Sequence, residues 1–129
     1  MDSANGTITR SFDGLDRLTQ EQTPQGTVSY TFDAAGRRAT MTVAGQSQVT
    51  YTWDNANRLT QIAQGTDVIG FAYDNADRRT STTLANGVVM AYGYSDADEL
   101  ASITYTKGAT TLGDLQYAYD ASGRRTGIS

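Results

Sequence analysis

Hydrophobic and polar residues alternate strictly in short stretches that recur along this chain. In "YTWDNANRLTQ", which begins at Tyr51, two aromatic residues flank a threonine and an aspartate follows directly. Nearly the same string begins at Tyr30, Phe71 and Tyr117. A period of two with one apolar side is typical of a β-strand that packs one face. Each stretch therefore predicts a strand that ends at the aspartate.

Aligning these stretches on the aspartate reveals a regular repeat. The residues at this position, called anchors below, are Asp13, Asp33, Asp54, Asp74, Ser95 and Asp120. The first four intervals between anchors differ by only one position, and the last is longer by four or five. A regular period of about 20 residues is the signature of a repeat architecture. We therefore expect residues 1–129 to form a single array of five to six repeats.

Three columns of apolar residues precede the anchors. The residue directly before each anchor is aromatic, the residue two places earlier is aromatic except at Arg10, and an aliphatic residue stands two places before that. Eleven of the twelve aromatic residues fall in these columns. The aromatic content therefore serves the repeat and leaves little for a separate binding pocket.

The residues after each anchor predict a tight turn. Three places after the anchor the chain has Asp16, Gly36, Asn57, Asp77, Asp98 and Gly123. These residue types tolerate the left-handed backbone that ends a three-residue hairpin loop. The anchor carboxylate can also accept a hydrogen bond from the turn backbone.

An arginine follows four places after every aspartate anchor. The resulting pairs are Asp13 and Arg17, Asp33 and Arg37, Asp54 and Arg58, Asp74 and Arg78, and Asp120 and Arg124. We expect each pair to face across the hairpin, where opposite charges contribute roughly 0.2–1 kcal/mol. The fifth copy has Ser95 and Glu99 instead, so both partners are replaced together.

After each turn the sequence continues through a polar-rich strand to a second, Gly-containing turn such as "TPQG" or "LANG". No segment shows helical periodicity, so the fold class expected is all-β, an antiparallel meander of about eleven short strands. Apolar residues lie at both odd and even offsets after the anchor, as at Leu59 and Ile62. Either a β-bulge intervenes or both faces of the sheet carry apolar side chains.

Composition removes several classes of function. The chain has no cysteine and no histidine, so we expect no metal site of the usual kinds, no cofactor and no imidazole-based catalysis. The formal net charge of −4 disfavours nucleic acid as a partner, and no apolar run is long enough to span a membrane. The acidic run "SDADE" lacks the spacing of an EF-hand loop, so a solvated turn is the better interpretation.

The string aromatic-x-aromatic-Asp-x-x-Gly/Asn/Asp-Arg, repeated over the whole chain, resembles the YD or RHS repeat. In that family, hairpins join into a ribbon of sheet that spirals into a hollow shell, in bacterial polymorphic toxins, Tc toxin components and teneurin ectodomains. The resemblance implies that this chain is an excerpt of such a shell and that flanking repeats and a toxin effector are its partners. It also implies a secreted or cell-surface bacterial protein.

A size estimate indicates how much of a shell this chain could form. A folded cargo of ~120 residues is roughly 35 Å across, and a wall around it needs about 30 strands at a spacing of ~4.8 Å. About eleven strands form less than half of that circumference. The sequence therefore predicts a wall segment, open at two strand edges and able to associate with itself through an edge or through the aromatic side.

Two other functions compete with this structural interpretation. A row of catalytic carboxylates is disfavoured because acid–base catalysis needs carboxylates in unlike environments, whereas a repeat gives each aspartate nearly the same one. We therefore expect no enzymatic activity. Stacked aromatic residues could instead bind carbohydrate, and the candidates are Tyr51, Trp53, Phe71 and Tyr73. Aromatic ladders that hold neighbouring hairpins together are the favoured explanation of these columns.

Overall fold

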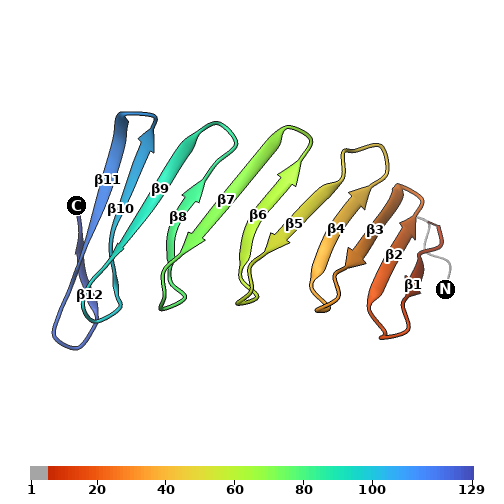
Figure 1. Ribbon diagram of the computed structural model, residues 1–129, viewed down its shortest axis with the longest axis horizontal. Helices are drawn as coiled ribbons and strands as arrows, with labels where there is room; N and C mark the ends of the chain where they lie inside the picture. Colours follow the sequence, from red (N-terminus) through yellow and green to blue (C-terminus); the bar gives the residue numbers. More distant parts are fainter. Residues whose placement is uncertain (1–5) are drawn as a thin grey trace. The chain divides into compact units, whose positions relative to one another are not determined.

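The structure is a computed structural model that describes residues 6–129, so the first five residues of the predicted array lie outside it. The described chain contains twelve strands and no helix (Figure 1). The strands are β1 (Thr9–Phe12), β2 (Leu18–Thr23), β3 (Gly26–Phe32), β4 (Arg38–Val43), β5 (Val49–Trp53), β6 (Leu59–Gln64), β7 (Asp67–Tyr73), β8 (Arg79–Thr83), β9 (Val88–Tyr94), β10 (Leu100–Lys107), β11 (Thr110–Tyr119) and β12 (Arg125–Ile128).

The chain divides into two compact units, Met1–Thr66 and Asp67–Ser129. In the first unit, β1 to β6 pair in sequence order, and every pair is antiparallel. The second unit repeats this arrangement with β7 to β12. The predicted all-β antiparallel meander is therefore confirmed. The strand number is twelve instead of about eleven, because all six copies contribute a strand on each side of the anchor turn.

A β-bulge follows every anchor turn and explains the odd spacing of apolar residues. In the third copy Trp53 pairs with Leu59 and Tyr51 pairs with Ile62, so Thr60 is the extra residue. The same register shift occurs in the other five hairpins that contain an anchor. Residues directly opposite each other share a face. Because of the bulge, Leu59 and Ile62, five and eight places after the anchor, therefore both lie on the face that carries the aromatic columns.

The two faces of each sheet differ in chemistry. The aromatic face carries the aromatic columns and their cross-strand partners, with Phe12, Tyr30, Phe32, Tyr51 and Trp53 in the first unit and Phe71, Tyr73, Tyr92, Tyr94, Tyr117 and Tyr119 in the second. The opposite side, called the polar face, presents mostly Thr, Ser, Gln and small residues. In the first unit, paired residues of the polar face are all Thr, Ser or Gln apart from Ala63.

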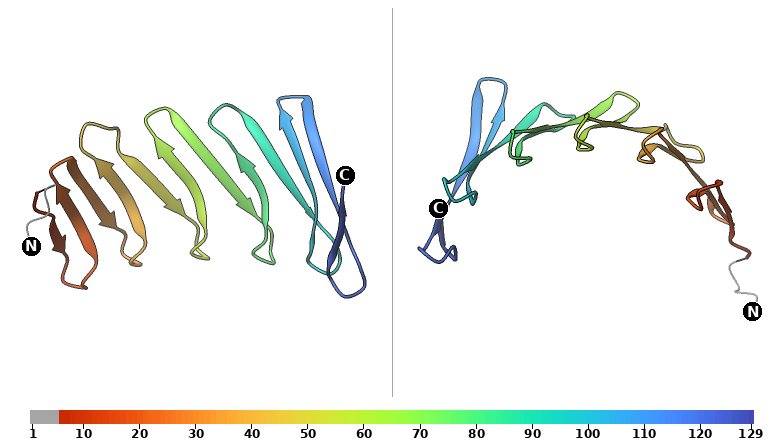
Figure 2. Two further views of the ribbon diagram at one scale, coloured as in Figure 1. Left: turned by 180° about the vertical axis from the view of Figure 1, so that it is seen from behind. Right: turned by 60° about the horizontal axis from the view of Figure 1, so that its bottom comes forward.

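Within the described residues, neither face of either unit is covered by a second layer (Figure 2). Only Val49 and Thr82 are buried there, and the aromatic side chains of the columns are half-buried apart from the exposed Phe12. Contacts between neighbouring hairpins therefore replace a closed core. Residues 6–129 include no helix of the length and apolarity needed to cross a membrane.

Candidate functional site: the anchor turns and the contacts between repeats

Each anchor turn is the five-residue segment from an anchor to the residue four places later. In the second copy, Asp33 N–H donates to the carbonyl oxygen of Arg37 at 2.8 Å, and Gly36 N–H donates to the carbonyl oxygen of Asp33 at 3.0 Å. Gly36 has a φ of +79°, in the left-handed region. All six copies have a positive φ at this position, including four where the residue is Asp or Asn. The residue types therefore predicted the backbone of the loop correctly.

The anchor carboxylate holds this loop with both of its oxygens. Asp33 Oδ1 accepts the N–H groups of Ala35 at 2.9 Å and Arg37 at 3.0 Å, while Oδ2 accepts Arg37 Nε at 2.8 Å. The other four aspartate anchors make the same contacts, with Nε to Oδ2 distances of 2.7, 2.7, 2.8 and 3.0 Å along the chain. The structure thus places all five predicted Asp and Arg partners at hydrogen-bond distance.

These contacts lower the pKa of every aspartate anchor. At Asp13, Asp33, Asp54 and Asp120 the leading cause is the hydrogen bond from the backbone N–H four residues later, which stabilises the charged carboxylate. At Asp74 desolvation is the largest influence and opposes the shift, yet the hydrogen bonds from Arg78 and Ala76 still lower the pKa. The five carboxylates therefore occupy closely similar electrostatic environments.

The fifth turn keeps the same backbone with different side chains. Ser95 Oγ accepts the N–H groups of Ala97 at 3.2 Å and Glu99 at 3.3 Å, and it lies 3.4 Å from Glu99 Oε2. Ser95 N–H donates to the carbonyl oxygen of Glu99 at 2.8 Å, and Asp98 has a φ of +63°. A neutral hydroxyl therefore replaces the carboxylate as the acceptor in the turn, and no arginine is needed for the loop to form.

The turn arginines also reach the next repeat, a role that the sequence analysis missed. Arg37 Nη1 donates to the carbonyl oxygen of Asp54 at 3.0 Å and to Asn57 Oδ1 at 2.8 Å, while Nε holds Asp33. The same guanidinium lies over the ring of Trp53, 5.7 Å from its centroid. One side chain therefore links the second turn to the third.

Other copies make equivalent contacts. Arg17 lies over Phe32 at 4.4 Å and Arg78 over Tyr94 at 4.7 Å, measured to the ring centroids. Arg78 Nη1 also donates to Asp98 Oδ1 at 2.5 Å. In each case the aromatic partner is the residue directly before the next anchor. The sequence shows that an aromatic residue stands directly before each anchor. It does not show that an arginine of the preceding turn lies over this ring, because that depends on how neighbouring hairpins align.

A second link between repeats uses the polar atom of the anchoring aromatic residue. Trp53 Nε1 donates to the carbonyl oxygen of Arg38 at 2.8 Å. Tyr94 OH donates to the carbonyl of Arg79 at 2.6 Å, and Tyr119 OH to the carbonyl of Leu100 at 2.7 Å. Each acceptor stands five places after the preceding anchor. This geometry explains why a ring with a donor suits that column, since Phe at the same position has no donor to offer.

Three of the four candidate ligand-stacking residues, Trp53, Phe71 and Tyr73, have rings that arginines approach. Arg37 lies over Trp53, and Arg79 lies 4.5 Å from the ring centroid of Phe71 and 5.9 Å from that of Tyr73. Tyr51 pairs across the strands with Ile62. A sugar that stacked on these rings would compete with the guanidinium groups. Ligand binding by these four residues stays a prediction.

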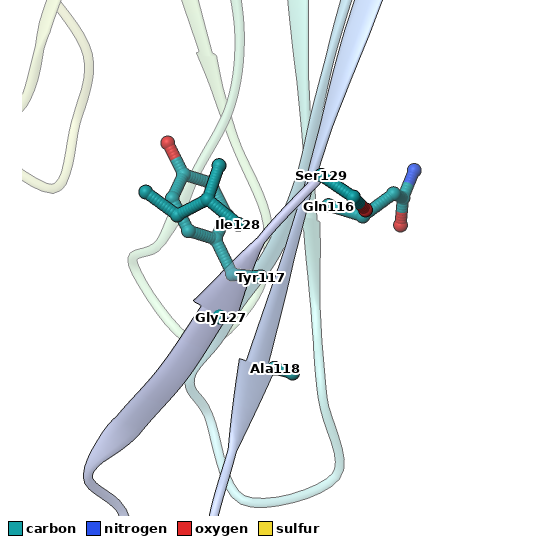
Figure 3. A pocket seen from close by; sticks show the side chains of 6 residues that line it. All are labelled: Gln116, Tyr117, Ala118, Gly127, Ile128 and Ser129. Carbon is teal, nitrogen blue, oxygen red and sulfur yellow. The ribbon is translucent and has the colours of Figure 1, made fainter.

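A surface hollow between β11 and β12 brings no set of catalytic groups together. It has a volume of about 250 Å³ (Figure 3). Its lining residues are Gln116, Tyr117, Ala118, Gly127, Ile128 and Ser129. The Tyr117 and Ile128 side chains lie together on one side of the ribbon, and Tyr117 is the only ionisable residue of this lining. Within residues 6–129 no three His, Cys, Asp or Glu side chains are grouped so as to hold a metal ion.

Comparison with known proteins agrees with the repeated turn. The model of the Teneurin YD-shell family matches residues 3–128 of this chain. The chain belongs to this family. The resemblance to RHS and YD repeats, drawn from the spacing of aromatic, Asp and Arg residues, is therefore confirmed. No curated protein matches the chain.

Solved structures of Tc toxins share the fold. The crystal structure of TcdB2-TccC3-TEV matches at a TM-score of 0.80 with 20% identity, over 96% of this chain and 8% of that chain. The crystal structure of TcdB2-TccC3 has the same TM-score with 21% identity and the same coverage. The Tc holotoxin pore of Photorhabdus luminescens matches at 0.74 with 17% identity, over 92% and 6%. This chain therefore has the fold of a YD-shell segment and spans a small part of the length of the proteins it matches.

Proposed function

We propose that this chain is a non-catalytic wall segment of a larger YD shell that encloses a polypeptide effector. The observation that carries this proposal is that Arg37 makes three contacts at once. It binds the Asp33 carboxylate of its own turn, donates to the backbone of the next turn and lies over the ring of Trp53. The polar groups of the turns are thus used to join one hairpin to the next. Such contacts are what a long, single-layer wall requires, because it has no second layer to hold its hairpins in place.

The electrostatics of the turns support a structural role over a catalytic one. A general acid and a general base need pKa values that their environments move apart. Here the pKa of every aspartate anchor moves in the same direction, downward, so all five stay ionised at neutral pH. The covered ring faces of Trp53 and Phe71 likewise favour a structural role for the aromatic columns over carbohydrate binding.

We also propose which neighbours the segment has and where the protein is located. Its six repeats form one array that continues into flanking repeats, and the partner on one face of the wall is the enclosed effector. Tc toxins and teneurins suggest a secreted or cell-surface protein, here of bacterial type. The TcdB2-TccC3 structures support a toxin setting, because their shells share the fold of this chain.

Limited proteolysis of the protein in which this segment occurs, with its flanking sequences included, tests the proposal. The enclosed effector should resist a protease that rapidly digests the same effector produced alone. The control is a protein of equal length in which Arg37→Ala and Arg78→Ala remove two links between repeats. Effector digestion at the same rate inside the intact protein as in isolation would contradict the proposal.

A further inference from the structure

All the cations outside the anchor turns lie on one side of the sheets. Of the ten Lys and Arg residues, five occupy the fourth place after an anchor and the other five lie on the aromatic face. The latter are Arg10, Arg38, Arg79, Lys107 and Arg125. Arg38, for example, pairs with Phe32 across the hairpin and therefore shares its face.

Carboxylates are scarce on the same face. Most acidic residues of the described chain lie in the anchor turns, and Asp114 lies on the polar face opposite Thr104. On the aromatic face only Glu21 and Asp67 remain, and Glu21 is held by Arg10 at 2.7 Å. Counted over strand positions alone, five cations and two carboxylates give the aromatic faces of the two units a net charge of +3, whereas the whole chain has a net charge of −4. At strand positions, positive charge is therefore found on the aromatic side. Beside it lie the Asp and Arg pairs of the turns, whose arginines approach Phe32, Trp53 and Tyr94.

Three of these cations are exposed and have no acidic partner within the described residues. Arg38, Arg79 and Arg125 make no ion pair there. Their guanidinium groups instead lie over aromatic rings, Arg38 at 4.4 Å from the centroid of Tyr30 and Arg125 at 5.9 Å from that of Tyr117. A guanidinium that stacks on a ring still presents N–H donors at its edge. These edges are available to a carboxylate that approaches the aromatic face.

The surroundings of these arginines are apolar and uncovered. Their neighbours on the face are half-buried aromatic and aliphatic side chains such as Tyr30, Met41 and Ile103. Apolar surface of this kind, with stacked arginines among it, is typical of a binding surface and not of a solvated face. The polar face offers the contrast, since in the first unit its paired residues are uncharged and almost all Thr, Ser or Gln.

We propose that the aromatic face binds polypeptide segments in which Asp or Glu residues occur beside apolar residues. Each unit binds such a segment by itself: carboxylates pair with the exposed edge of Arg38 in the first unit and with those of Arg79 and Arg125 in the second. The apolar side chains of the segment cover the aromatic and aliphatic residues beside these arginines. This inference rests on the proposed function, because it assigns the aromatic face to the enclosed effector and names the chemistry of the segments that touch it.

Binding of synthetic peptides to the 129-residue chain tests this inference. The probe is a short fluorescein-labelled peptide built from Glu, Leu, Ser and Gly, and its twin carries Lys in place of every Glu. Fluorescence anisotropy should show that the acidic peptide binds and the basic twin does not, with affinity falling as salt is added. The triple variant Arg38→Gln, Arg79→Gln and Arg125→Gln should bind the acidic peptide about tenfold more weakly.

A matched control changes the same net charge on the other face. The variant with Gln20→Glu, Gln61→Glu and Gln116→Glu also lowers the net charge by three, but these positions lie on the polar face. Its affinity for the acidic peptide should stay within about threefold of the wild type, since distant exposed charges are screened. Equal losses in both variants, binding of the basic twin, or no binding of either peptide would each overturn the inference.

Self-association of the chain through its aromatic face would also contradict the inference. If sedimentation shows a dimer that the acidic peptide does not dissociate, a second copy occupies the face and the inference is wrong. The proteolysis experiment on the shell is independent of these measurements. A wall that protects its effector but fails to bind the acidic peptide would leave the shell proposal standing and remove only this assignment.

Discussion

The second and fifth anchor turns have the same backbone and differ in what they do for the next repeat. Both close with a 2.8 Å hydrogen bond from the anchor N–H to the carbonyl four residues later, and both have a positive φ at the third position. In the second turn Arg37 reaches Asn57 and Trp53. In the fifth, Glu99 takes the place of the arginine, and its Oε1 lies beside Gly123, 3.0 Å from where a Cβ atom at that position would stand.

This difference shows that the shape of a turn and its link to the next turn depend on different residues. The shape of the turn depends on an acceptor at the anchor and on a residue that tolerates the left-handed backbone, and Ser95 with Asp98 supplies both. The link to the next turn depends on the guanidinium. A hairpin can therefore fold correctly and still be joined less firmly to its neighbour.

The largest expected effect concerns the backbone that the two turns share. Gly36 has a φ of +79°, and a β-branched residue is strained there. Gly36→Val should lower the free energy of unfolding by about 2 kcal/mol. Gly36→Asn is the control, because Asn57 holds the equivalent position in the third turn with a φ of +62°. Chemical denaturation measures both variants, and an equal loss for Val and Asn would contradict the role of the left-handed backbone.

The next effect concerns the link to the neighbouring repeat. Arg37→Ala removes the contacts to Asp33, Asn57 and Trp53 together, and should cost about 1–2 kcal/mol of unfolding free energy. Arg124→Ala is the matched control, since that side chain is 80% exposed and contacts Asp120 alone among the ion pairs of the described chain. It should cost less than about 0.5 kcal/mol. Equal losses would show that the arginine acts only within its own turn.

Acid sensitivity also distinguishes an aspartate turn from the fifth turn. The pKa of Asp33 lies below its ordinary value of 3.8, chiefly because its carboxylate accepts the Arg37 N–H. A lowered pKa in the folded state contributes stability above the unfolded pKa, and this is lost as pH falls through the folded pKa. Stability should therefore stay level from pH 7 to about 5 and fall below about 4.

The variant Asp33→Asn keeps an acceptor and removes one titrating group. The acid-induced loss of its unfolding free energy should be smaller than that of the wild type by roughly one fifth, because five anchors share the lowered pKa. Ser95→Ala serves as the control, since the serine does not titrate and its removal should leave the pH dependence unchanged. If the unfolding free energies of the wild type and Asp33→Asn changed in parallel with pH, the Asp33 carboxylate would not contribute to the acid sensitivity.

The smallest effect comes from restoring the missing pair in the fifth turn. Ser95→Asp with Glu99→Arg should show a favourable coupling of a fraction of a kcal/mol, which a double-mutant cycle measures. Glu99→Arg alone should already stabilise the chain slightly, because the new guanidinium can approach Tyr119 as Arg78 approaches Tyr94. Hydrogen exchange at the fifth turn reports the change locally if unfolding is not two-state. Zero coupling at both low and moderate salt would remove the electrostatic explanation for the recurring Asp and Arg.

The sequence predicted what depends on neighbouring residues and missed what depends on the spacing of hairpins. The left-handed positions at Gly36 and Asp98 followed from residue type, because only a few side chains tolerate that backbone. The bulge at Thr60 was one of two explanations left open, since the apolar offsets alone do not say which residue leaves the ladder. The reach of Arg37 to Trp53 was not foreseen, because it depends on how two hairpins align.

The bulge after each anchor turn also has a consequence for how a gene of this kind can change length. A strand pattern with a period of two fails if an odd number of residues is inserted, since every later side chain turns to the wrong side. Here the first four intervals between anchors alternate between an even and an odd number of residues, yet the aromatic columns keep their face. Each hairpin sets its own alignment at the turn and the bulge. Recombination that copies or deletes one hairpin therefore leaves the others in register, and the wall can lengthen or shorten by whole hairpins.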